Sequence, residues 1–238
     1  MKEKLSYLNA ELKGMSLAES IPFVLKNFGG KKVFSTSFGI EDQVLTHYLA
    51  EYAQFISAFT LDTGRQFPET YEVFQRTQTK YPQLNIETFF PDPEDIKKYV
   101  SNAGVNGFYN SIENRKECCR IRKVVPLQKA IKGASLWITG LRAEQSDNRS
   151  DMQFLEWDEA NGLVKFNPLL NYTLKETEAV VEAFNIPINS LYKQGYLSIG
   201  CAPCTRAISK GESFRAGRWW WENGKKECGL HIHSDKNY

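Results

Sequence analysis

Five cysteines are the residues of this 238-residue chain whose spacing best suits chemistry. Cys118 and Cys119 are adjacent, Cys201 and Cys204 form a Cys-x-x-Cys pair, and Cys228 stands alone ten residues before the C-terminus. Two close pairs are typical of the ligands of one metal centre, whereas a single cysteine in a polar terminal segment is typical of a nucleophile. The pattern predicts a metal or iron–sulfur protein that also carries out thiol chemistry.

The two cysteine pairs suit either tetrahedral zinc or a [4Fe–4S] cluster. Neighbouring side chains diverge, so Cys118 and Cys119 reach separate irons of a cluster more readily than one small zinc ion. Two other interpretations stay open. Cys118 is also suited to be a small core residue, and Cys201 with Cys204 to be a redox dithiol.

Cys228 lies in a positively charged neighbourhood, after Lys225 and Lys226 and three residues before His231. Nearby positive charge lowers the pKa of a thiol and so raises the fraction of reactive thiolate. Gly229 leaves the backbone room to bring the sulfur close to a ligand. These neighbours favour a nucleophile over an incidental cysteine.

A basic segment surrounds the adjacent cysteines, with seven Lys or Arg residues between Arg115 and Lys132 against the single acid Glu117. Such a run is often a solvated helix face. It also supports an alternative of another class, a zinc-stabilised nucleotide- or RNA-binding module. That alternative leaves Cys228 without a role, so we expect a small anionic ligand and no nucleic-acid partner.

Composition fits a globular protein, with 42% hydrophobic residues, 24% charged residues and a net charge of +2. No apolar run is long enough to cross a membrane, and no secretory h-region follows Met1. We therefore expect a cytoplasmic protein without membrane partners. In that reducing compartment, cysteines are more often metal ligands or redox catalysts than members of disulfides.

Strand and helix patterns alternate along most of the chain. Helices are predicted over 1–28, 41–53, 68–81, from Pro93 and over 115–131, and strands over 31–37, 54–61, 85–90 and 135–139. This order predicts an α/β fold with a mostly parallel twisted sheet and helices on both faces. We expect a nucleotide-binding domain over 1–194 and a C-terminal segment over 195–238 that carries the Cys-x-x-Cys pair and Cys228.

Three segments follow predicted strands, where parallel sheets bind ligands. Backbone amides and hydroxyls in the first two, and arginine forks in the third, suit phosphate or sulfate oxygens. Plain capped turns, and surface ion pairs to Glu144 and Asp147, are the alternatives. The candidate binding residues are Ser35, Thr36, Ser37, Phe38 and Gly39, then Leu61, Asp62, Thr63, Gly64 and Arg65, then Arg142, Gln145 and Arg149.

These motifs, in this order, resemble the assimilatory adenylyl-sulfate (APS) and phosphoadenylyl-sulfate (PAPS) reductases. The resemblance rests most on Lys-Glu-Cys-Cys-Arg-Ile-Arg-Lys at 116–123, Cys-Ala-Pro-Cys at 201–204 and Glu-Cys-Gly-Leu-His at 227–231. It implies the PP-loop type of nucleotide-binding fold. The ATP-using members of that fold carry Ser-Gly-Gly-x-Asp-Ser, where this chain has Ser-Phe-Gly-Ile-Glu-Asp at 37–42, which argues against an ATP pyrophosphatase.

The resemblance also implies roles for particular residues. Cys118, Cys119, Cys201 and Cys204 would hold a [4Fe–4S] cluster, and Cys228 would attack the sulfur of APS to give AMP and an enzyme S-sulfocysteine. Thioredoxin or glutaredoxin would then release sulfite. Use of PAPS, alone or beside APS, is the nearest alternative, and the sequence is compatible with a homo-oligomer. Further substrate contacts implied are Lys116, as a link to the cluster, Arg215 and Arg218 on the sulfate side, and His231.

Overall fold

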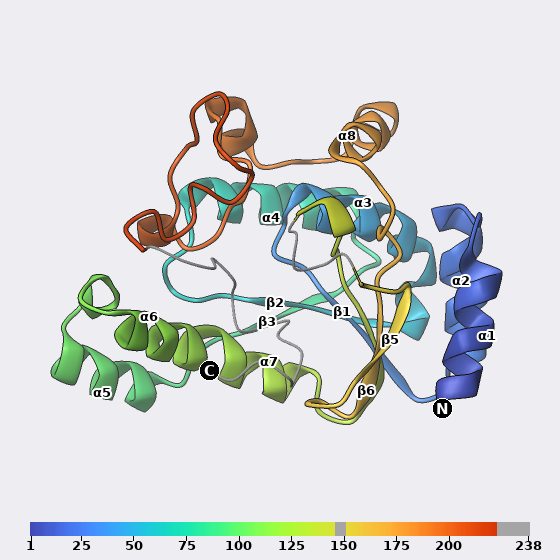
Figure 1. Ribbon diagram of the computed structural model, residues 1–238, viewed down its shortest axis with the longest axis horizontal. Helices are drawn as coiled ribbons and strands as arrows, with labels where there is room; N and C mark the ends of the chain where they lie inside the picture. The colour runs from blue at the N-terminus through green and yellow to red at the C-terminus, as the bar shows by residue number, and fades with distance from the viewer. Residues whose placement is uncertain (146–150, 223–238) are drawn as a thin grey trace. The chain divides into compact units, whose positions relative to one another are not determined.

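A six-stranded sheet organises the computed structural model, which describes residues 1–145 and 151–222 (Figure 1). The strand order is β3-β2-β1-β4-β6-β5. β1 pairs in parallel with β2 and β4, and β4 pairs in parallel with β6. β5 pairs with β6 in the antiparallel direction. The predicted α/β class with a mostly parallel sheet is confirmed. The strands are β1 (Lys31–Ser35), β2 (Ser57–Leu61), β3 (Ile86–Phe89), β4 (Ala134–Ile138), β5 (Leu155–Asp158) and β6 (Leu163–Phe166).

Two helices precede the sheet, α1 (Lys2–Leu12) and α2 (Leu17–Asn27). Leu5, Leu8 and Leu12 recur at helical spacing in α1 and are buried, as the sequence predicts. Ser16 begins α2 with a capping box in which its side chain and backbone pair with Glu19.

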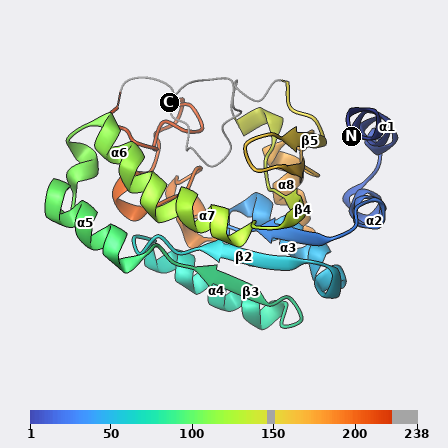
Figure 2. The ribbon, with the colours of Figure 1, turned by 90° about the horizontal axis from the view of Figure 1, so that it is seen from below.

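Helices α3 (Ile40–Leu49), α4 (Pro68–Lys80) and α8 (Leu174–Ala183) lie on the same side of the sheet (Figures 1 and 2). A short 3₁₀ turn (Ala50–Phe55) continues α3. Leucine, isoleucine, valine and phenylalanine side chains from these helices, from α1 and α2 and from the strands form one hydrophobic core, in which Val44, Leu45 and Phe34 are fully buried. Burial on this scale holds the ends of β1 and β4 in fixed positions.

The strand order reverses beside β1, because the chain passes from β1 to β2 and β3 in one direction and then returns to β4 on the other side of β1. Ligands of open α/β sheets bind outside the carboxyl ends of the strands at such a reversal. Residues 35–39 follow β1 and residues 139–145 follow β4. Two of the three predicted ligand segments therefore flank the reversal point.

The chain divides into two compact units. The first comprises residues 1–59, 70–87 and 133–189. Among the described residues, the second comprises 60–69, 88–132 and 190–222. The predicted boundary at residue 194 stays a prediction. None of the described helices is long and apolar enough to cross a membrane.

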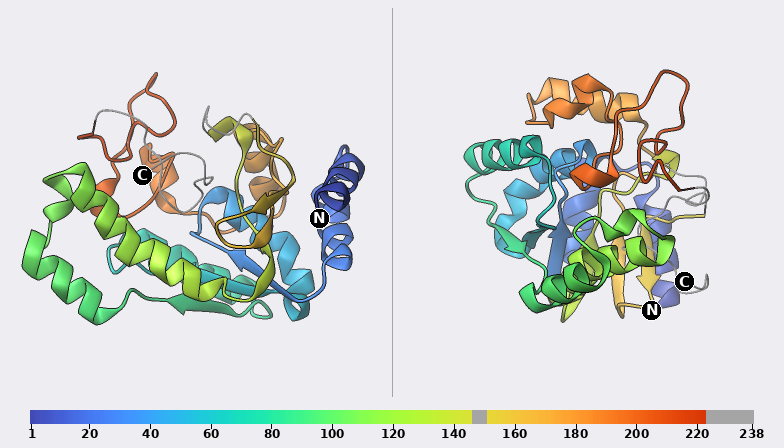
Figure 3. Two further views of the ribbon diagram at one scale, coloured as in Figure 1. Left: turned by 60° about the horizontal axis from the view of Figure 1, so that its bottom comes forward. Right: turned by 90° about the vertical axis from the view of Figure 1, so that its left-hand side faces the viewer.

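The second unit is built on α5 (Pro93–Ala103), a 3₁₀ turn (Gly107–Tyr109) and a long helical rod that runs beside α5 (Figure 3). The rod consists of α6 (Ile112–Cys119), a π-helical turn (Arg120–Val124) and α7 (Val125–Ala130). The sequence predicts one helix over 115–131 and does not predict the π turn. Single π turns inside helices are frequent at functional sites. Further 3₁₀ turns are Ala143–Gln145 in the first unit and Ser190–Gln194 and Ala202–Cys204 in the second.

Candidate functional site

The loop after β1 uses its hydrogen-bond donors internally. The backbone N–H and the hydroxyl of Ser37 both donate to Asp42, at 2.6 and 2.8 Å. The N–H of Phe38 donates to the Thr36 hydroxyl at 3.0 Å, and Ser35 accepts from the Trp137 indole at 2.8 Å. The sequence predicts that the Ser37 donors bind an anionic ligand. In the structure, the carboxylate of Asp42 accepts both of them.

Phe38 gives this loop its sharp bend. Its φ of 59° lies in the left-handed region that side chains larger than glycine seldom adopt. The ring is buried and stacks on Phe74 with 4.6 Å between ring centroids, which offsets the backbone strain. Strained residues of this kind cluster at binding sites and active sites.

The loop after β4 approaches the same carboxylates. A Cβ on Gly140 would collide with Asp42, so only glycine fits there. Arg142 is 1% exposed and forms ion pairs with Glu41 (2.9 Å) and Glu144 (2.5 Å), while its backbone N–H donates to Gln145. The predicted binding arginine is therefore held in two internal ion pairs, of which the pair with Glu41 is buried. Arg149, its predicted partner, lies outside the described residues.

Replacing Asp42 with Asn will flatten the pH dependence of stability between pH 4 and 7. Burial raises the pKa of Asp42 from 3.8 to about 6, even though Ser37 donates two hydrogen bonds to it, and Glu41 adds to the rise. A carboxyl that is harder to ionise in the folded state stabilises the fold at low pH, and that stability is lost as the pH rises through about 6. The loss amounts to at most about 3 kcal/mol, and an amide does not show it.

Urea unfolding at pH 4.5 and 7.5 measures the difference for wild type and Asp42→Asn. Glu178→Gln, at an exposed position of α8, is the control and is expected to keep the wild-type slope. If Asp42→Asn has the same pH dependence of stability as wild type, then the pKa of Asp42 does not differ between the folded and the unfolded protein.

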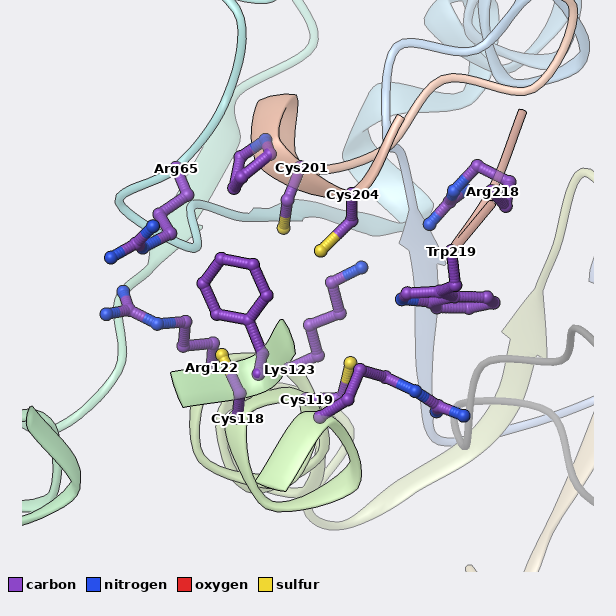
Figure 4. A pocket seen from close by; sticks show the side chains of 12 residues that line it. Arg65, Cys118, Cys119, Arg122, Lys123, Cys201, Cys204, Arg218 and Trp219 are labelled. Atoms are coloured by element: carbon purple, nitrogen blue, oxygen red, sulfur yellow. The ribbon is translucent and has the colours of Figure 1, made fainter. Parts of the chain in front are cut away.

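All four paired cysteines line one pocket of the second unit. Figure 4 shows the sulfur atoms of Cys118 and Cys119, at the end of α6, turned toward the same space as those of Cys201 and Cys204. Both cysteine pairs therefore line the same pocket, while their role as ligands of one metal centre stays a prediction. The pocket is lined by Arg65, Phe108, Arg115, Cys118, Cys119, Arg122, Lys123, Cys201, Pro203, Cys204, Arg218 and Trp219.

Hydrogen bonds from the loop after β2 hold the Cys-x-x-Cys turn. The Thr63 hydroxyl lies 3.3 Å from the sulfur of Cys201, and the N–H of Ala202 donates to the Arg65 carbonyl at 2.8 Å. The Arg122 guanidinium donates to the Thr63 carbonyl at 2.6 Å. A segment predicted from the sequence to contact substrate is thus bonded directly to the cysteine turn.

Three buried N–H groups of the pocket lack a hydrogen-bond partner within the described part of the chain. They are Nε of Arg122, Nε of Arg218 and Nε1 of Trp219. A buried donor without a partner costs roughly 1–3 kcal/mol. Three such donors beside four thiols fit a group that carries negative charge and accepts hydrogen bonds, as sulfur ligands of an iron–sulfur cluster do.

Trp219 joins the pocket to the end of the described chain. It is fully buried with a φ of 41°, and its ring lies 4.7 Å from the guanidinium carbon of Arg115 and 4.8 Å from that of Arg218. Arg115 also forms a bidentate ion pair with Glu222, with both N–O distances at 2.9 Å and both side chains under 10% exposed. This pair fixes the chain six residues before Cys228.

The sequence of this chain matches a known family. The model of the phosphoadenosine phosphosulfate reductase domain matches residues 31–207. The chain belongs to this family. The relative from Agrobacterium fabrum named adenosine 5′-phosphosulfate reductase is 48% identical over 226 residues, which cover 94% of this chain and 86% of that protein.

Two further comparisons agree with the family assignment. A protein of the same name from Allochromatium vinosum is 52% identical over 200 residues, covering 84% of this chain and 78% of that protein. The crystal structure of a phosphoadenylyl-sulfate reductase from Candida auris, a phosphate complex, has a TM-score of 0.74 and covers 87% of this chain and 98% of its own. At 24% identity, that likeness shows the fold alone.

Some residues that the reductase resemblance singles out lie away from the pocket or outside the described chain. Lys116 on α6 and Arg215 are not among the lining residues, whereas Arg65 and Arg218 are. Arg65 donates to Asn106 and to the Val105 carbonyl. Cys228 and His231 lie outside the described residues, so their roles stay predictions.

Sequence reasoning missed Arg122 and Lys123 as individual pocket residues. Residues four apart on a helix share a face, so Cys118 predicts Arg122 beside it, and Cys119 predicts Lys123. This spacing was a usable signal inside the basic segment. Figure 4 shows the Lys123 side chain extending toward Cys204.

Burial makes the bare thiols of this reductase pocket hard to ionise. It raises the pKa of Cys204 to about 12, an effect to which Cys201 adds. It also raises the pKa of Cys118, although the Arg122 guanidinium acts in the opposite direction. Within the described ranges, no three His, Cys, Asp or Glu side chains form a group that could hold a single metal ion.

Proposed function

We propose that this protein is an adenosine 5′-phosphosulfate reductase that converts APS to AMP and sulfite with electrons from a dithiol protein. The observation that carries the proposal is the pocket that brings four cysteines together with Arg65, Arg122 and Lys123. Positive charge of this density suits a substrate with adjacent phosphate and sulfate groups. The names of the two curated relatives, which align over most of the chain, support the same activity.

In the first step, the Cys228 thiolate attacks the sulfur of APS. An S–S bond forms, the bond between that sulfur and the bridging phosphate oxygen breaks, and AMP leaves with the electron pair. AMP phosphate is a stable anion, so no strong general acid is needed. Cationic side chains that hold the oxyanions supply most of the rate enhancement. We assign this role to Arg215, Arg218, Lys116 and Lys123, with His231 beside the nucleophile.

In the second step, a thiolate of thioredoxin or glutaredoxin attacks the sulfur of Cys228. The bond to the sulfonate breaks and sulfite leaves. The second thiol of the partner then releases Cys228 and closes the partner's own disulfide. The dithiol loses two electrons and the sulfonate sulfur gains them, so the balance is complete. Such partners stay reduced in the cytoplasm, to which we assign the protein.

We propose that Cys118, Cys119, Cys201 and Cys204 would hold a [4Fe–4S] cluster. Support comes from the pocket that the four sulfurs share and from the unpartnered N–H groups of Arg122, Arg218 and Trp219. When bound, the cluster supplies charge to the site rather than electrons, because the dithiol provides both electrons of the reaction.

The purified protein is expected to form sulfite from APS at least about 100-fold faster than from PAPS at equal concentration, with dithiothreitol or thioredoxin as reductant. The two nucleotides differ by one 3′-phosphate, which a site shaped for the 3′-hydroxyl rejects through repulsion and bulk. PAPS reduction is the second candidate function, favoured by the description of the matching family model. Faster turnover of PAPS would select it, and no sulfite from either nucleotide would contradict the proposed function.

A further inference from the structure

An exposed aromatic cluster lies beside the cysteine pocket and has no role in the chemistry above. It consists of Phe108, Tyr109, Trp220 and Trp221. Ring centroids of Tyr109 and Trp221 are 4.4 Å apart, and those of the two tryptophans are 4.9 Å apart. Trp220 and Tyr109 are each 40% exposed, while Phe108 is buried beneath them.

The cluster is rigidly tied to the pocket. The Tyr109 hydroxyl donates to the Pro203 carbonyl of the Cys-x-x-Cys turn at 2.6 Å. The N–H of Trp219 donates to the Cys204 carbonyl at 3.1 Å, and the N–H of Glu222 donates to the Trp219 carbonyl at 2.9 Å. Two large rings are therefore held partly in solvent at one fixed place, which costs free energy unless a partner covers them.

The length of chain between Glu222 and Cys228 limits where the dithiol protein can bind. Glu222 is fixed by its buried ion pair with Arg115, and Cys228 follows it by six residues. Six residues reach at most about 22 Å. A dithiol protein whose sulfur bonds to Cys228 therefore reaches this chain within about 22 Å of Glu222, and Trp220 and Trp221 are the residues immediately before that anchor.

We propose that Tyr109, Trp220 and Trp221 form the docking surface for the dithiol protein that reduces the S-sulfocysteine of Cys228. The inference rests on the proposed function, which supplies the covalent intermediate. Tyrosine and tryptophan are the residues most enriched at the centres of protein interfaces, because their rings bury large apolar areas at low entropic cost. The partner's thiolate forms a bond to the Cys228 sulfur, sulfite leaves, and the partner's second thiol restores Cys228.

Trp220→Gln tests the proposal with two reductants. With thioredoxin, KM for the reductant is expected to rise at least about tenfold, as on removal of an interface aromatic residue. With dithiothreitol, which needs no docking surface, the rate and the KM for APS are expected to stay at wild-type values. Trp157→Gln is the matched control, because Trp157 is 41% exposed on β5 in the first unit, and both rates should be unchanged.

Each other outcome overturns the docking surface. An unchanged KM for thioredoxin in Trp220→Gln means that the reductant binds elsewhere. A raised KM for APS means that the ring contacts the nucleotide, and a change in oligomeric state on gel filtration means that the cluster joins two copies of this chain. Failure of the proposed function looks different, since wild type would then form no sulfite with either reductant. Circular dichroism and iron content of the variant confirm that it is folded.

Discussion

Cys228→Ser will lose sulfite formation from APS by at least about three orders of magnitude, as enzymes do when their nucleophile is removed. A serine hydroxyl is almost wholly protonated at neutral pH, whereas a cysteine thiol ionises far more readily. An oxygen nucleophile also cannot form the S–S bond that the second thiol later exchanges. The variant is expected to bind APS, since the cationic residues are intact.

A discontinuous sulfite assay and mass spectrometry of the intact protein after a single turnover measure this effect. Wild type gains the mass of one sulfonate and Cys228→Ser does not. Ser234→Ala, six residues further along the same terminal segment, is the control and should react like wild type. Sulfite formation by Cys228→Ser near the wild-type rate would end its assignment as the nucleophile.

Cys204→Ala will lose most bound iron and lower the melting temperature by several degrees or more. Cys204 is buried in the small hydrophobic core of the second unit with Cys118, Cys201, Phe108 and Trp219. Removing one of the four proposed ligands weakens binding of the proposed cluster, and it also takes a sulfur out of that core. Metal binding to a folded site adds its free energy to folding stability, so both quantities fall together.

Iron and sulfide analysis, visible absorbance and a thermal melt monitor this change without an activity assay. Cys228→Ser is the matched control, because it removes a cysteine that is not one of the four proposed ligands and should leave iron and melting temperature unaltered. Four irons per chain in Cys204→Ala would exclude this cysteine as a ligand. A colourless wild-type protein that holds zinc with full activity would exclude the cluster itself.

Local patterns in the sequence predicted much of the fold. The leucines of α1, the cap at Ser16 and the short strands β1 and β4 follow from spacing and turn residues alone. The hairpin of β5 and β6 was missed, although Asn161-Gly162 between them is a strong hairpin signal. Gly162 has a φ of 63°, in the left-handed region that glycine adopts readily.

In the candidate site, too, some features can be predicted from the sequence and others cannot. The gathering of two cysteine pairs follows from the chemistry of their side chains, which have few other uses in a buried position. The partners of the arginines do not follow, because Arg142 meets Glu41 across 101 residues and Arg115 meets Glu222 across 107. Contacts of that separation depend on how the elements pack, and local spacing carries no information about them.

The loop after β2 is hydrogen-bonded to the cysteine turn at 201–204, and these bonds couple the two segments. Thr63 contacts Cys201, Arg65 accepts from Ala202, and Arg122 holds the Thr63 carbonyl. If this loop also binds the nucleotide, as the sequence predicts, then the nucleotide and the group held by the cysteines both depend on the backbone of this loop. Linkage then requires reciprocity: loading the cysteine pocket changes the affinity for APS by the same factor by which APS changes the retention of iron. Chelation of the iron is therefore slowed by saturating nucleotide if the coupling is positive, and accelerated if it is negative.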